Sequence, residues 1–104
     1  MTAINAFDKT IEIDSQYVPA WSNKALALNN IGKYDEAIRA CDKAIEIDPQ
    51  DALAWFEKGF SLNNLGKYDK AILALDKAIE LDPKFAAEAW NNNCLLYTSP
   101  SPRD

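Results

Sequence analysis

Two segments of this chain recur almost residue for residue at a spacing of 34 residues. Residues 42–49 read Asp-Lys-Ala-Ile-Glu-Ile-Asp-Pro, and residues 76–83 read Asp-Lys-Ala-Ile-Glu-Leu-Asp-Pro. The same spacing separates Trp21 from Trp55. A fixed period of about 20–50 residues is typical of proteins that stack one small structural unit many times. We therefore predict an array of units, and the period constrains the fold more than any other feature of the sequence.

Each unit has the pattern of two helices. Trp21, Ala25 and Leu28 share one face of a helix, and a second periodic apolar stripe follows Gly32. Glycine at this point supplies the left-handed residue that ends a helix, and a proline follows the second stripe. The sequence predicts helices near residues 2–13, 19–30, 35–47, 53–64, 69–81 and 87–97. We further expect Asp35 and Asp69 to cap the helices that follow each glycine.

These residues resemble the tetratricopeptide repeat, whose pattern runs Trp-x2-Leu-Gly-x2-Tyr, then Ala-x3-Phe, then Pro. Lys24 and Lys58 replace the family's leucine, with stems that can cover apolar surface while the ammonium stays in water. The resemblance implies an all-α solenoid of helical hairpins, a right-handed superhelix of about six helices. The structural repeat positions are Trp21, Ala25, Leu28, Gly32, Tyr34, Ala37, Cys41, Ala44, Pro49, Trp55, Gly59, Leu62, Gly66, Tyr68, Ala71, Leu75, Ala78, Pro83 and Trp90.

The repeat divides the chain, and the division suggests a fragment. We expect a second helix of a truncated repeat at 1–17, full repeats at 18–51 and 52–85, and a further first helix at 86–97. Residues 94–104 read Cys-Leu-Leu-Tyr-Thr-Ser-Pro-Ser-Pro-Arg-Asp and resemble the translation of an adapter used for sequencing libraries. We expect this tail to be non-native, in preference to a natural linker rich in serine and proline, and exclude it from functional reasoning.

Composition excludes several classes of function. The chain has no histidine, and Cys41 and Cys94 are not spaced as metal ligands, so we expect no catalytic, cofactor-binding or metal site. A net charge of −5 with mixed signs argues against nucleic acid and against anionic membranes. No apolar run is long enough to span a membrane, and no signal peptide opens the chain. Since we expect the natural N-terminus to be missing, the absent signal peptide carries little weight, and cytoplasmic localisation is an expectation only.

Two chemically suggestive features have structural explanations. Cys41 lies on an inner helix face, so a buried structural thiol is favoured over a reactive one. Paired acids recur in each repeat, whereas an active site is normally unique. Lys43 with Glu46, and Lys77 with Glu80, are spaced for ion pairs on a helix surface.

The candidate binding surface lies on the first helix of each repeat. The residues left over after stacking positions are assigned include Asn23, Leu26, Phe56, Glu57, Phe60 and Asn92, our candidate peptide-binding residues. In the resembled family, first helices line a concave groove that grips peptides, and asparagine can pair with a peptide backbone. The alternative is that the phenylalanines belong to the stack and the asparagines end helices. For Asn29, Asn30, Asn63 and Asn64 helix capping is the favoured interpretation.

The predicted function is a scaffold for protein–protein interaction. The alternative is a repeat region that recruits substrate for a catalytic domain outside this chain, and a third possibility is a stacking element of a larger assembly. Some family members clamp acidic tails with lysine and arginine, but the corresponding positions here carry none, so we do not expect that activity. Glu57 and Glu88 place negative charge in the same strip, so we expect a neutral or basic peptide or protein partner. We also expect self-association through open repeat ends, where Ala3, Phe7 and Thr10 lack the cover of a preceding helix.

Overall fold

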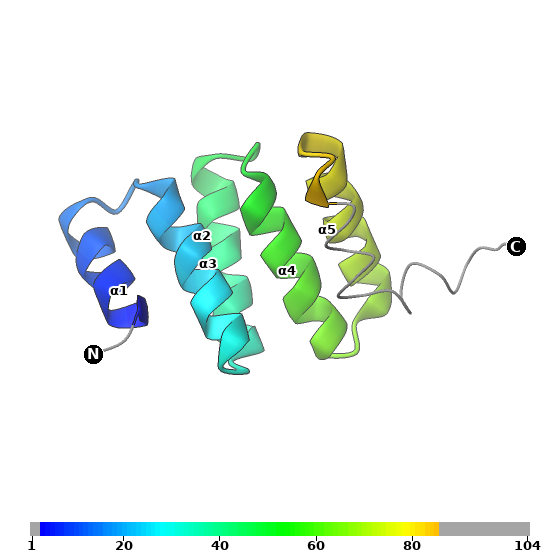
Figure 1. The fold of residues 1–104 in the computed structure, drawn as a ribbon, viewed down its shortest axis with the longest axis horizontal. Coiled ribbons are helices and arrows are strands. Elements are labelled where there is room, and N and C mark those ends of the chain that lie inside the picture. The colour runs from blue at the N-terminus through cyan, green and yellow to red at the C-terminus, as the bar shows by residue number, and fades with distance from the viewer. Residues whose placement is uncertain (1–2, 86–104) are drawn as a thin grey trace, which may run out of the picture.

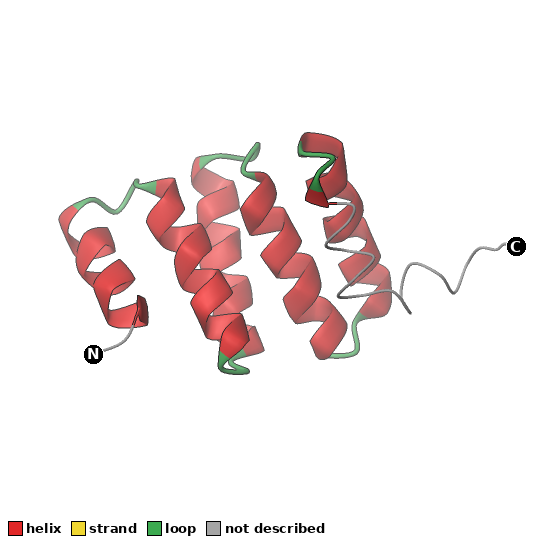
Figure 2. Ribbon diagram, viewed as in Figure 1, coloured by secondary structure: helices red, strands yellow, loops and turns green. Residues whose placement is uncertain are grey.

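The computed structural model describes residues 3–85 of the chain, and every regular element there is an α-helix (Figures 1 and 2). The helices are α1 (Ala3–Ile13), α2 (Val18–Asn30), α3 (Tyr34–Ile47), α4 (Ala52–Asn64) and α5 (Tyr68–Leu81). Each begins one residue from its predicted start and ends where predicted. The expected helix at 87–97 lies outside the described residues. Between residues 3 and 85, no helix has the length and apolar character needed to cross a bilayer.

The two glycine turns end the first helix of each repeat in the same way. Gly32 and Gly66 have φ of +82° and +83°, a conformation that costs residues with a Cβ. The next N–H, of Lys33 or Lys67, returns to a carbonyl in the last helical turn, at 2.9 Å in each case. This is the Schellman arrangement, which satisfies carbonyls that a helix end leaves unpaired.

The starts of the second helices differ from the prediction. We expected Asp35 and Asp69 to act as caps, and this is wrong. α3 and α5 begin one residue earlier, at tyrosine, and the cap positions are Lys33 and Lys67, without a side-chain capping bond. The aspartates instead lie in the first helical turn, where negative charge interacts favourably with the helix dipole.

The helices form hairpins that follow one another along the molecule. Among the described helices, the closely packed pairs are α1–α2, α2–α3, α2–α4, α3–α4 and α4–α5. α1 lies at one end and α5 near the other (Figure 1). The pair α3–α5 is not among them, so α4 contacts both second helices and holds them apart.

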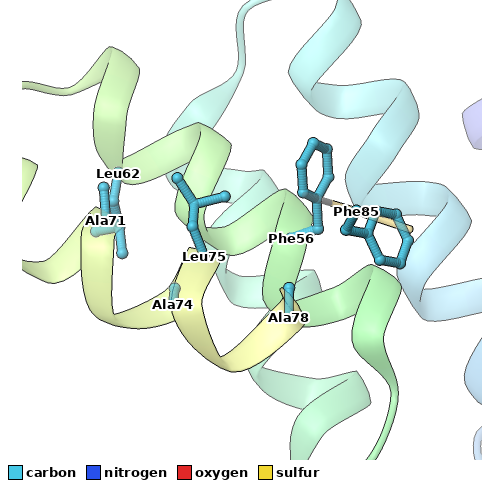
Figure 3. Close-up of a cluster of buried hydrophobic side chains, with 7 residues drawn as sticks. All are labelled: Phe56, Leu62, Ala71, Ala74, Leu75, Ala78 and Phe85. Atoms are coloured by element: carbon cyan, nitrogen blue, oxygen red, sulfur yellow. The ribbon is translucent and has the colours of Figure 1, made fainter. Parts of the chain in front are cut away.

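The tightest contact lies inside the second hairpin, where Gly59 of α4 faces Leu75 of α5. A Cβ at Gly59 would lie 2.6 Å from Leu75 Cγ and 3.2 Å from the Ala71 carbonyl oxygen. Leu75 is fully buried in the cluster shown in Figure 3. In the first hairpin the same repeat positions carry Ala25 and Cys41, both fully buried. At these positions the first hairpin has the larger first-helix residue and the smaller second-helix residue, so the two differences in side-chain volume offset each other.

Two polar contacts recur at each junction between repeats. The indole N–H of Trp55 donates to the carbonyl of Pro49 at 2.9 Å, and that of Trp21 donates to Ser15 at 2.8 Å. Lys58 Nζ lies 2.7 Å from Asp42 Oδ1, and Lys24 makes the equivalent pair with Asp8. Each ammonium also lies 5.7 Å from the tryptophan ring centroid of its own helix. The lysines thus link a first helix to the second helix before it, as their amphipathic stems allow.

The N-terminal end is less exposed than expected. Phe7 and Thr10 are partly buried, whereas their equivalents Cys41 and Ala44 are fully buried. Among the described helices, α1 packs closely on α2. The side chain of Ala3 lies outside the description.

The Gly59–Leu75 contact yields the first prediction. We expect Gly59→Ala to lower the free energy of unfolding by about 1–2 kcal/mol, because overpacking outweighs the gain in helix propensity. In a Leu75→Cys background, which copies the first hairpin, the same change should cost nothing or stabilise. Urea denaturation of the four proteins, followed by circular dichroism, measures the difference. An equal cost in both backgrounds would show that Leu75 is not what excludes a side chain at position 59.

Candidate functional site

The exposed or partly exposed side chains on one side of α2 and α4 include Asn23, Leu26, Asn30, Phe60 and Asn64, which we call the first-helix face. Leu26 is 37% exposed although it is a leucine in the middle of a helix, and Asn23 is partly exposed one turn before it. Phe60 is partly buried, with its ring centroid 6.5 Å from that of Tyr34 at the start of α3. The face therefore offers an aliphatic side chain, an aromatic edge and amides that the packing of the described residues leaves accessible.

Phe56 does not belong to this face. Its side chain is 4% exposed, and its ring stacks on Phe85 with centroids 5.0 Å apart and an interplanar angle of 23° (Figure 3). The expectation that stacking does not require Phe56 is therefore wrong. Its partner follows α5, and the contact closes the end of the second hairpin's core.

Glu57 is also buried, at 4% exposed, because it takes part in a polar network between repeats. The Asn29 amide Nδ2 donates to Glu57 Oε1 at 2.8 Å and to the Glu57 carbonyl at 3.1 Å. The Ser61 hydroxyl donates to Asn29 Oδ1. Asn29 therefore joins α2 to α4 and is not the helix cap that we predicted. Since buried polar groups are costly when unpaired, this network holds the two first helices in one register.

The remaining asparagines do not form one class. Asn64 Nδ2 donates to the Phe60 carbonyl at 2.8 Å, one turn earlier on α4, and Asn30 is exposed. Asn63 is partly buried, and its polar groups are not all left without a partner. Asn92, the last candidate binding residue, lies outside the described residues.

Cys41 is not in the environment of a reactive thiol. It is fully buried, and burial together with the nearby Glu57 carboxylate raises the pKa of its thiol well above the ordinary value. A thiol with a raised pKa is a poor nucleophile, because the thiolate is the reactive form.

A groove on the other side of α4 was not anticipated from the sequence. It has a volume of about 680 Å³ and lies between α3 and α5 over α4. We call it the basic groove; it is lined by Asp35, Ile38, Arg39, Trp55, Lys58, Leu62, Lys67, Lys70, Leu73, Ala74 and Lys77. Trp55, Lys58 and Leu62 follow helical spacing, and Asn64 is on roughly the opposite side of α4 at about 100° per residue.

Two of the groove's five cations have identified ion-pair partners. Lys58 pairs with Asp42, and Lys77 Nζ lies 3.7 Å from Glu80 Oε1, the surface pair predicted from spacing. Arg39, Lys67 and Lys70 make no ion pair within residues 3–85. One sequence signal could have indicated this groove: Lys70 and Leu73 stand where the first repeat has glutamate and arginine.

Comparison with known proteins supports the two full repeats inferred from the sequence. A family profile described as tetratricopeptide repeat matches residues 18–51 and 52–85. Among curated proteins, an uncharacterized protein of Methanocaldococcus jannaschii is 51% identical over 35 residues. That match covers 34% of this chain and 41% of the relative, so the chain spans less than half of that protein.

Solved structures share the arrangement over more of the chain. The second TPR of Spaghetti (RPAP3), bound to the HSP90 peptide SRMEEVD, is 28% identical with a TM-score of 0.73, covering 76% of this chain and 73% of that one. The TPR2B domain of yeast Sti1, in a pHsp70 complex, is also 28% identical, with a TM-score of 0.75 and coverage of 90% and 76%. MamA is 30% identical, with a TM-score of 0.70 and coverage of 81% and 49%.

The Asn29 network yields the second prediction. We expect Asn29→Ala to lower the free energy of unfolding by about 1–3 kcal/mol, because it removes the hydrogen bonds of buried groups on α4. Asn30→Ala, a neighbouring change at an exposed asparagine, should cost less than about 0.5 kcal/mol. Chemical denaturation of both variants makes the comparison, and equal losses would show that the network does not couple the repeats.

Proposed function

The chain belongs to the tetratricopeptide repeat family, and we propose that it is a binding scaffold that holds a peptide or a partner protein on its first-helix face. The observation that carries the proposal is Leu26, an exposed apolar side chain on α2 among accessible amides. Such a mixture suits an extended peptide, because amides pair with its backbone while an apolar side chain receives one of its residues. The peptide complexes of the Spaghetti and Sti1 domains support this use of the fold.

The contact surface is assigned by elimination. Phe56 and Glu57 are buried, and the Asn29 amide donates its hydrogen bonds to Glu57 on α4. A ligand on the described part of the face therefore contacts Asn23 and Leu26, and the accessible edge of Phe60. This surface is short, and we expect dissociation constants of about 10–100 μM, since few anchoring contacts are available.

The charge of the face favours a neutral or basic ligand. α2 and α4 each carry one lysine, and both lysines lie on the far side of their helices and are paired with aspartate. The chain as a whole has a net charge of −5, which disfavours an anionic ligand at a face without cations. The SRMEEVD peptide of the Spaghetti complex contains three acidic residues, so we propose that this face selects a different kind of peptide.

The third prediction tests the face with a random peptide array probed by the full chain. Bound peptides should be mainly neutral or basic, and each should carry an apolar residue. Leu26→Ser should weaken binding of the best peptides at least tenfold, because a leucine contact of about 1.5 kcal/mol or more is lost.

Leu73→Ser is the matched control, since Leu73 is more exposed than Leu26 but lies on α5 beside the basic groove. It should leave binding of these peptides within about twofold. Circular dichroism verifies that both variants are folded. Mainly acidic hits, or equal losses from the two serine variants, would show that the first-helix face is not the binding surface.

A further inference from the structure

The basic groove differs in charge from the molecule that carries it. Five of its eleven lining residues are lysine or arginine and one is an aspartate, whereas the whole chain has a net charge of −5. Basic residues are thus concentrated on one face, between the second helices α3 and α5. Clustered charge of one sign in a concave surface strengthens the local potential and attracts ligands of opposite charge.

The walls of the groove present cations that the described structure does not neutralise. Arg39 lies on the α3 wall and Lys70 on the α5 wall, with Lys67 at the cap position of α5. None of the three makes an ion pair within residues 3–85. A guanidinium can bind a carboxylate through two parallel hydrogen bonds, and the ammonium groups attract carboxylates as point charges.

The groove also has an apolar component. Leu73 projects from α5, and 69% of its surface is exposed to water. Ile38, on the opposite wall, is partly buried. Trp55 lines the same groove, and its indole N–H is already bonded to Pro49. The tryptophan therefore offers ring surface, and the groove can receive an aliphatic side chain between charged contacts.

The equivalent groove one repeat earlier shows that these features are not imposed by the fold. That groove, of about 510 Å³, is lined by Trp21, Lys24 and residues of α3, but Glu36 stands in place of Lys70 and Arg39 in place of Leu73. The second repeat alone combines a free lysine with an exposed leucine at these two positions in the described structure.

We propose that the basic groove is a second docking surface, which binds an acidic segment of a partner protein that carries an apolar residue between its carboxylates. Arg39 and Lys70 bind carboxylates from the two walls, and Leu73 with Trp55 contacts the apolar side chain. The exposed leucine favours a peptide over nucleic acid, whose phosphates would leave it uncovered. This surface is separate from the first-helix face, so an experiment can contradict one binding proposal and leave the other intact.

The experiment measures fluorescence anisotropy of a fluorescein-labelled decapeptide in which two leucines are flanked by aspartates and glutamates. Its counterpart replaces every acid by the matching amide and keeps both leucines. The full chain should bind the acidic peptide at least fivefold more tightly than the amide peptide at low ionic strength. The difference should shrink as salt is added, because salt screens the charge contacts.

The test variant is Lys67→Glu/Lys70→Glu, and it should weaken binding of the acidic peptide at least tenfold. The matched control is Lys9→Glu/Lys33→Glu, which makes the same change in net charge at exposed lysines outside the groove. Lys33 holds the same helix-capping position as Lys67, one repeat earlier. The control should change binding less than about twofold, apart from the general effect of net charge at low salt. Thermal melts establish that both variants fold.

Two further arms separate the alternatives. Leu73→Ser should weaken acidic binding, whereas Leu26→Ser on the first-helix face should not. A comparable loss in the lysine control, or equal affinity for the acidic and amide peptides, would overturn the proposal. So would tighter binding of a single-stranded 20-nucleotide DNA than of the acidic peptide, since that would make the groove a general polyanion site.

Discussion

The close approach of the two helices in each hairpin is the contact on which the rest of this structure depends. Gly59 lets α4 come against the buried Leu75, and Ala25 with Cys41 fills the same place one repeat earlier. Each hairpin then stacks on the helix before it with the same tryptophan hydrogen bond and the same lysine–aspartate pair. A unit that cannot bury its apolar face alone is stabilised by such neighbours.

This packing also creates two surfaces of different chemistry. α4 lies against both α3 and α5, which separates the second helices and opens the basic groove over Trp55 and Leu62. The first-helix face, around Leu26, carries amides and apolar atoms, whereas the groove carries lysine and arginine. Under our two proposals, the two surfaces would bind segments of unlike charge on different sides of α4.

The sequence predicted the helices well because their ends are local features. The glycine turns and the prolines recur at 34 residues, so each helix could be placed to within one residue. The aspartate caps were predicted wrongly because the turn after Gly32 uses backbone hydrogen bonds and lets the helix start at Tyr34. Burial of the candidate site residues was harder to predict from the sequence, since it depends on side chains of other segments. Phe56 is covered by Phe85, and Glu57 is held by Asn29. The first repeat has serine, asparagine and aspartate where the second has Phe56, Glu57 and Phe85.

The basic groove was missed for the same reason, because it combines residues of three helices that no single periodic pattern contains. Lys77 was recognised as half of a surface ion pair, but its place beside Arg39 and Lys70 requires the spacing of α3 and α5. Charge on a repeat protein is therefore best read across neighbouring second helices as well as along each one.

The central functional claim is that ligand binding takes place on the first-helix face. Its most direct test is an NMR titration of the ¹⁵N-labelled chain with the tightest neutral or basic peptide from an array. The account predicts amide shift changes centred on Asn23, Leu26 and Phe60, with the amides of Lys70 and Leu73 unmoved at saturation. Shift changes confined to α3 and α5, with α2 unaffected, would contradict it.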